Sequence, residues 1–261
     1  MSTPQPANAA VLIDDLMEQA VGALEMASYF EAEVLAHRAL QRALEARDYE
    51  RMSRICLPLQ EARRQKMQLA QDAGAVTVLE AAALKTGLRS AGMYLVQPPM
   101  TAADARALRI NADHAGVPVI VLAREPMSRS GARTGKWPIA AVGPSFGAAW
   151  GARDLTIRAY TDPPPGVTPT DNGATRDVLT QKVPVQWFLG ACEALGDAAI
   201  ARLKPEDPAA HQVEDLFELA GAWPLHEKLH QRLADSCRAA MIEPAPTSER
   251  RRGAAENPWV F

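Results

Sequence analysis

The spacing of hydrophobic residues changes twice along the chain, from helical to strand-like and back to helical. Apolar residues recur every three or four positions over residues 11–71 and 184–241, which predicts amphipathic helices. Between them lie short apolar runs punctuated by glycine and proline, which predict five strands. The runs are residues 75–79, 93–96, 117–123, 139–142 and 155–160. The expected fold class is mixed α and β, with N- and C-terminal antiparallel helical hairpins flanking a small mixed α/β sheet.

The N-terminal helical region, residues 11–73, is expected to hold three helices. The first begins at Val11, the second follows Ser28 and ends near Arg47, and the third covers about residues 48–71. Pro58 lies inside the third helix, where its missing N–H predicts a kink or a split. Residues 1–10 are small, polar or proline, and we expect them to be disordered.

The middle region, residues 74–182, contains a strand-helix-strand crossover. Thr101 and Asp104 form a capping signature at the start of its helix, and Gly116 provides the stop. A helical crossover joins parallel strands, so the two flanking runs should pair in parallel, with the helix on one face of the sheet.

Three prolines mark helix starts in the C-terminal helical region, residues 183–242. Proline suits the first turn, so helices should begin at Pro184, Pro208 and Pro224 and end near residues 203, 221 and 241. If these helices pack against the N-terminal ones, the middle region is an insertion rather than a separate domain. Residues 243–261 are expected to form a flexible tail whose apolar end docks on its own protein or on another.

Composition narrows the classes of function. The chain has 261 residues, 48% of them hydrophobic, and a net charge of −3, so no overall positive field would hold nucleic acid or an anionic membrane. No apolar run reaches the roughly 18 residues of a membrane-spanning helix. Three cysteines, an odd number spread along a chain with no leader segment, are typical of a reducing cytoplasm. We expect a soluble cytoplasmic protein, and the sequence leaves its oligomeric state open.

The second predicted helix carries an aromatic residue followed by small residues. The spacing of Tyr29, Ala32, Ala36, Ala39 and Leu40 resembles the second helix of a tetratricopeptide repeat, and the resemblance covers about residues 13–46. It implies closely nested helices that bind a protein partner. Alanine-rich helical hairpins of no particular family give similar spacing.

Residues 226–230 match the His-Glu-x-x-His pattern of zinc metallopeptidases. Histidines four apart share a helix face, so His226 and His230 would hold one zinc ion while Glu227 polarises the bound water. The resemblance is confined to these five residues, since Lys228 stands where an uncharged residue is usual and no further ligand motif follows. Cys237 shares this face and gives a second possible zinc set with the histidines. An ordinary amphipathic helix is the alternative, and we assign no metal and no cofactor.

Ser145 lies between Gly143 and Gly147, directly after a predicted strand. This is the Gly-x-Ser-x-Gly pattern of a serine-hydrolase nucleophile elbow, which requires a helix immediately behind the serine. The following residues are glycine-interrupted and lead to another strand. A turn between antiparallel strands therefore explains these glycines better.

Residues 124–136 form a basic, glycine-containing loop at the carboxyl end of a predicted strand. Ligands bind at such ends in open sheets with parallel strands, and arginines suit phosphate or carboxylate. Our hypothesis is an anion site formed by Arg129, Arg133 and Lys136. A solvated loop is the alternative.

The third predicted helix has a basic face. Four of its arginines, together with Lys66, could line a groove for an acidic partner, or they could form a solvated surface. The candidate partner-binding residues are Arg51, Arg54, Arg63 and Arg64.

These patterns favour a non-enzymatic interaction or scaffold protein built on tetratricopeptide-like helices. A zinc-dependent hydrolase at His226, Glu227 and His230 is the first alternative. A small-anion sensor using residues 124–136 is the second.

Overall fold

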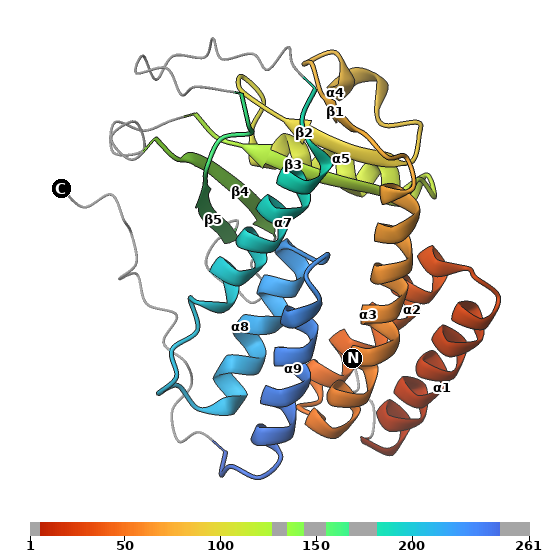
Figure 1. Cartoon of the computed structure of the whole chain (residues 1–261). Helices are drawn as coiled ribbons and strands as arrows, with labels where there is room; N and C mark the ends of the chain where they lie inside the picture. Colours follow the sequence, from red (N-terminus) through yellow and green to blue (C-terminus); the bar gives the residue numbers. More distant parts are fainter. Residues whose placement is uncertain (1–5, 127–134, 144–154, 167–181, 246–261) are drawn as a thin grey trace.

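The computed structural model describes residues 6–126, 135–143, 155–166 and 182–245. These residues form a five-stranded sheet with helices on both faces and a tall helical layer extending below it (Figure 1). The expected mixed α and β fold class is confirmed. No helix in these ranges is both long and apolar enough to cross a bilayer.

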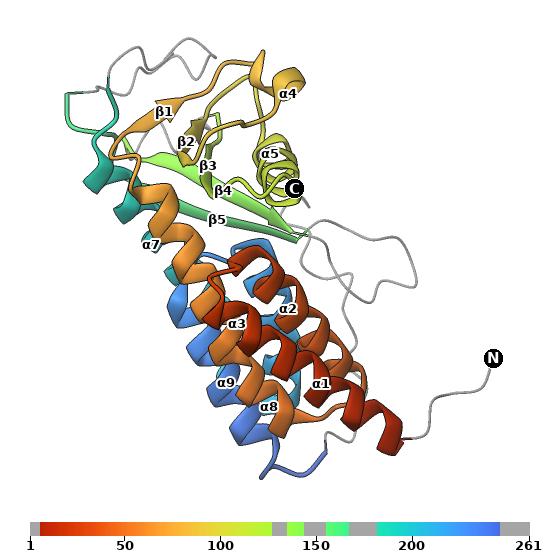
Figure 2. The same cartoon turned by 90° about the vertical axis from the view of Figure 1, so that its right-hand side faces the viewer.

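Three consecutive antiparallel helices form the N-terminal part of the layer: α1 (Pro6–Glu25), α2 (Tyr29–Glu45) and α3 (Tyr49–Gln71) (Figure 2). Four alanines of α2 are buried, and their small side chains let neighbouring helices approach closely. Helix α1 begins at Pro6, inside the segment expected to be disordered. Proline is favoured at the first helical position and three of the next four residues are alanine, so local propensity already supports this turn.

The predicted split of the third helix is wrong, because α3 continues through Pro58 as one element of 23 residues. Ile55, Cys56 and Leu59 lie on both sides of the proline and are buried in the main core. Burial of these side chains stabilises the helix by several kcal/mol, on the order of the roughly 3 kcal/mol cost of an internal proline.

The sheet has the strand order β1 (Val76–Val78), β2 (Gly92–Val96), β3 (Val119–Arg124), β4 (Trp137–Gly143) and β5 (Leu155–Thr161). β1, β2 and β3 are parallel, whereas β4 and β5 continue the sheet as antiparallel neighbours. All five predicted strands are therefore present. Between β1 and β2 lies a single-turn helix, α4 (Ala83–Thr86), which the sequence pattern did not predict.

The predicted crossover between β2 and β3 is confirmed. Helix α5 (Ala102–His114) begins with a complete capping box, in which Thr101 and Asp104 exchange hydrogen bonds. Its alanine and leucine stripe packs on one face of the sheet, against Tyr94, Val96 and Val121. Alternate strand residues point to the other face and join the main core, as the period of two requires.

The opposite face of the sheet is covered by α3 and by the C-terminal helices α7 (Val185–Ile200) and α8 (Ala209–Ala222). The last helix, α9 (Glu227–Ala240), packs against α3, α7 and α8. Pro184 and Pro208 cap α7 and α8 as predicted, but α9 begins only after His226. Helix α9 packs along α3 (Figure 1). The N- and C-terminal helices therefore form one layer, and the sheet region is inserted between its two halves.

Candidate anion-binding pocket

A cavity of about 330 Å³ opens between α2, α3 and α5, beside the end of α8. We call it the α2–α5 pocket. Its size is at the lower end of the roughly 300–1,000 Å³ typical of small-molecule sites. The lining residues are Phe30, Glu33, Val34, His37, Arg38, Arg63, Lys66, Arg106, Arg109, Ile110, Asp113, His114 and Gly221.

Helical periodicity explains which side chains reach the pocket. On α2 the lining residues are Phe30 and those three, four, seven and eight positions later, which is one face of a helix. On α5 the same spacing starts at Arg106. These faces are not the alanine-rich ones that each helix packs into the core. The pocket therefore lies where two helix faces, each with charged and apolar side chains, meet across α3.

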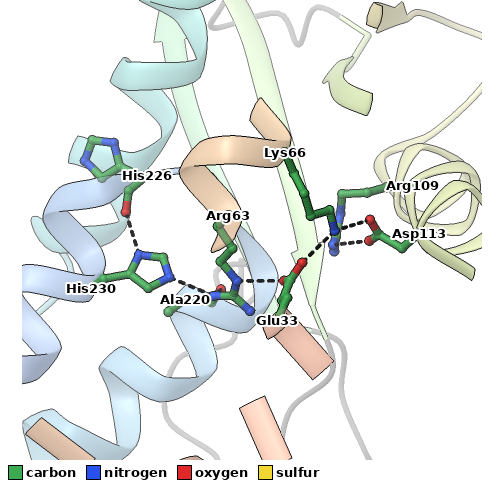
Figure 3. A network of polar contacts seen from close by, with 8 residues as sticks. All are labelled: Glu33, Arg63, Lys66, Arg109, Asp113, Ala220, His226 and His230. Carbon is green, nitrogen blue, oxygen red and sulfur yellow. Dashed lines mark hydrogen bonds and ion pairs between the residues drawn. The ribbon is translucent and has the colours of Figure 1, made fainter. Parts of the chain in front are cut away.

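A buried carboxylate organises the floor of the pocket (Figure 3). Glu33 accepts a hydrogen bond of 2.8 Å from Arg63 Nε and one of 2.5 Å from Lys66 Nζ. Lys66 also donates to Asp113 of α5 at 2.6 Å, and Arg109 lies 3.6 Å from the same carboxylate. This network joins α2, α3 and α5, and it holds Arg63 and Lys66 only 7% and 8% exposed.

The network fixes the charge of Glu33. Burial alone would raise the pKa of this carboxyl, but the positive charges and hydrogen bonds of Arg63 and Lys66 lower the pKa to about 2. Glu33 is therefore ionised at neutral pH and in mild acid.

Arg63 extends the network to the C-terminal helices. Its Nη1 contacts the Ala220 carbonyl oxygen at 3.2 Å and His230 Nε2 at 2.8 Å. Because arginine only donates, His230 Nε2 accepts, and His230 Nδ1 carries the proton that it donates to the His226 carbonyl oxygen at 3.0 Å. Burial and the Arg63 charge lower the pKa of His230 to about 3. This histidine is thus neutral and has a structural partner.

The pocket has more positive than negative side chains. Arginine and lysine contribute five lining residues, against two carboxylates, Glu33 and Asp113. Among the residues that the structure describes, no carboxylate forms an ion pair with Arg38 or Arg106. The Nε of Arg106 is buried and has no hydrogen-bond partner there. The arrangement can therefore attract an anion and offer it guanidinium N–H donors.

His226 and His230 do not converge, although each is only 1% exposed. The His226 ring rests on Gly196 of α7, with its nitrogens 3.4 Å from Glu193 and 3.3 Å from Asp197, whereas His230 faces Arg63 (Figure 3). The prediction of a shared helix face is wrong, because His226 has extended backbone dihedrals and caps α9 from outside.

The other members of the zinc hypothesis are also separated. Glu227 is the first residue of α9 and is half-buried, while Cys237 is buried in the main core. Burial raises the pKa of the Cys237 thiol, which disfavours the thiolate that a metal requires. In the described ranges no three histidine, cysteine or acidic side chains gather as a metal site.

Most of the arginines on the predicted basic surface of α3 form ion pairs with carboxylates of the same chain. Arg51 pairs with Asp14 and Asp48, Arg54 with Glu50, and Arg64 with Glu61. Arg63 is interior, so its assignment to an accessible partner surface is wrong. The reason is that α2, α8 and α9 cover this part of α3.

Most of the predicted basic loop lies outside the described residues, including Arg129 and Arg133, and so does Ser145. Lys136 lies 3.5 Å from Asp162 and is half-exposed. Arg124 is buried over the Trp137 ring, 4.1 Å from its centroid. The described part of this loop therefore brings no cluster of cations together.

Sequence reasoning missed the α2–α5 pocket, although one signal was available. Arg106, Arg109 and His114 lie outside the alanine-leucine stripe of α5, and Glu33, His37 and Arg38 share one face of α2. Such faces usually meet water. Nothing in the spacing indicated that the two faces would enclose a cavity.

Comparisons of the chain with protein families, with curated proteins and with solved structures gave no match.

Proposed function

We propose that this protein binds a small organic anion in the α2–α5 pocket, as a sensor or carrier rather than as an enzyme. The observation that carries the proposal is the cavity of about 330 Å³ lined by five cationic side chains and two carboxylates. Arg106 is half-buried and its Nε has no hydrogen-bond partner among the described residues. Such a group is costly to leave unpaired, so an anion that enters the cavity stabilises the folded protein.

Apolar side chains support an organic ligand over a bare inorganic ion. Phe30, Val34 and Ile110 line the same cavity, and Val34 is 55% exposed. Lys66 Nζ lies 4.3 Å from the centre of the Phe30 ring, which fixes the ring beside the charged floor. A ligand with an anionic group and an apolar body would cover both kinds of surface.

The proposal is tested by thermal unfolding of the full chain with three compounds that share a benzene ring. Benzoate and phenyl phosphate are anionic, and benzyl alcohol is neutral. At a concentration of about 100 Kd, binding raises stability by about 2.7 kcal/mol, a rise of several degrees in Tm. We expect this rise with the anions only; no rise with any anion, or the same rise with the alcohol, contradicts the proposal.

Arg38 and Arg42 provide matched variants for this test. Both are exposed arginines of α2, but only Arg38 lines the pocket. We expect Arg38→Gln to weaken the Tm response to anions by removing one of the uncompensated charges, and Arg42→Gln to leave it unchanged. Equal responses of the two variants would place the binding elsewhere.

We also propose a protein-interaction role as a second function, as the helical pattern first suggested. Its support is the outer helix α1, where Val11, Leu12 and Val21 are 40–59% exposed. The test is copurification of partner proteins from the native source. We expect a Val11→Glu/Val21→Glu variant to lose a partner that the unchanged protein retains, while its Tm is unchanged. A cytoplasmic location remains a prediction.

A further inference from the structure

We infer that the anionic group of the ligand is a phosphoryl group and that Arg38 and Arg106 bind it. The inference rests on the proposed function, and it specifies the chemical class of the ligand within the same pocket.

The pocket carries an excess of positive charge. Arg63 and Lys66 already share Glu33, and Lys66 and Arg109 share Asp113. In the described part of the chain, Arg38 and Arg106 remain without a carboxylate partner, one on each of the two helices that face the pocket. The five cations exceed the two carboxylates by three charges. A monoanion would leave most of this excess uncompensated, whereas a dianion removes most of it.

The two arginines also offer more hydrogen-bond donors than one carboxylate group can accept from. A guanidinium presents planar pairs of N–H donors that match phosphate and carboxylate oxygens. The buried Nε of Arg106 lacks an acceptor among the described residues, and a buried donor without an acceptor destabilises the folded state. A phosphate monoester concentrates a charge of about −1.5 to −2 and three acceptor oxygens on one phosphorus. It can therefore serve two arginines at once, which a single carboxylate does less well.

Apolar side chains beside the two arginines suit the organic part of the ligand. Phe30 and Val34 of α2 and Ile110 of α5 lie among the charged lining residues. Ile110 is four positions after Arg106 and Val34 four positions before Arg38, so on each helix an apolar residue and the arginine are neighbours one turn apart. A phosphoryl group held by the arginines would leave its organic substituent against these apolar side chains.

The experiment measures Kd by calorimetry for the full chain at low salt and about pH 7.5 with four probes. These are phenyl phosphate, phthalate, benzoate and inorganic phosphate. We expect phenyl phosphate to bind roughly tenfold more tightly than each of the others, since it alone combines a compact dianion with an apolar ring. If phthalate binds as tightly as phenyl phosphate, the pocket does not select a phosphoryl group over a pair of carboxylates, and the inference is overturned. If inorganic phosphate binds as tightly as phenyl phosphate, the apolar side chains of the pocket do not contribute to binding, and the inference is also overturned.

Variants of the two arginines test their assignment. We expect Arg38→Gln and Arg106→Gln each to weaken phenyl phosphate binding roughly tenfold and to reduce its advantage over benzoate. Arg106→Lys keeps the charge but loses the planar donor pair, so it should recover only part of the affinity. Arg42→Gln is the control. If Arg106→Gln does not fold, Arg38→Gln and Arg106→Lys still test the assignment. If both of these variants keep the full preference for phenyl phosphate over benzoate, the assignment is overturned.

Failure of this inference can be told apart from failure of the proposed function. If the aromatic anions bind equally well and benzyl alcohol does not bind, the anion pocket stands and the phosphoryl assignment falls. If no anion binds more tightly than benzyl alcohol, the proposed function itself falls.

Discussion

Glu33 is the residue on which the interior charges depend. Its carboxylate is the counter-charge of Arg63 and one of two carboxylate acceptors for Lys66, and both cations are almost fully buried. Without it, Arg63 would keep only the Ala220 carbonyl and His230 as acceptors. A buried cation without a counter-charge is strongly destabilising.

We therefore predict that Glu33→Gln destabilises the protein at about pH 7 by about 3–5 kcal/mol, the usual cost of breaking a buried ion pair by removing one partner. Urea unfolding of the full chain would measure the change. Glu31→Gln, an exposed position of the same helix, should change stability by less than about 0.5 kcal/mol. Similar losses in both variants would mean that the Glu33 ion pairs contribute little.

At the scale of elements, α7 and α9 meet at a contact without spare volume. The His226 ring, which precedes α9, lies directly on Gly196 of α7, and a Cβ atom at position 196 would overlap the ring. Gly143 at the end of β4 meets Ala222 of α8 in the same way. Glycine is needed at these two positions because another segment occupies the space of a side chain.

Alanine substitutions on α7 separate this packing effect from helix propensity. Gly190 lies on the same helix with nothing within 4 Å of an added Cβ, so Gly190→Ala should stabilise by up to about 1 kcal/mol. Gly196→Ala should instead destabilise by about 1–3 kcal/mol through overpacking. Thermal unfolding of both variants would measure the difference.

A second substitution checks the cause. Gly196→Ala combined with His226→Ala should recover part of the loss, since the smaller side chain makes room for the new methyl group. Additive losses in the double variant would show that the clash with the imidazole is not responsible.

For the whole molecule, the half-buried His37 and the buried His230 connect stability to pH. Burial and the nearby charge of Arg63 lower the pKa of His37 to about 4 and that of His230 to about 3, from an ordinary value of 6.5. Between the ordinary pKa of 6.5 and these lowered pKa values, the unfolded chain binds protons that the folded protein does not bind. Stability is therefore highest above pH 6.5 and falls as the pH is lowered toward 4.

We predict a loss of stability of up to about 1.4 kcal/mol per pH unit for each of these histidines between about pH 6 and pH 5. Glu33 does not contribute in this range, because its depressed pKa removes stability only below about pH 4.5. Urea unfolding as a function of pH would measure the slope. His230→Gln should be less stable at about pH 7 and should have a slope smaller by about one proton; an unchanged slope would contradict the neutral state of His230.

The sequence by itself determined the elements and most of the sheet. Alternation and helical spacing record which side of each segment is buried, so the five strands, the crossover helix capped by Thr101 and the main helices were predictable from local pattern. Hydrophobic spacing does not record which elements meet. The tertiary structure decided that α9 lies along α3, that the His226 and His230 rings turn apart, and that Arg63 and Lys66 are interior.

The candidate site depends entirely on the tertiary structure. Glu33 and Arg63 are 30 positions apart, Lys66 and Asp113 are 47 apart, and Arg63 and His230 are 167 apart. On an isolated helix each of these side chains would be a solvated surface charge. Only the packing of α2, α3, α5 and α9 removes water from them, and burial is what turns ordinary surface charges into an organised network beside a cavity.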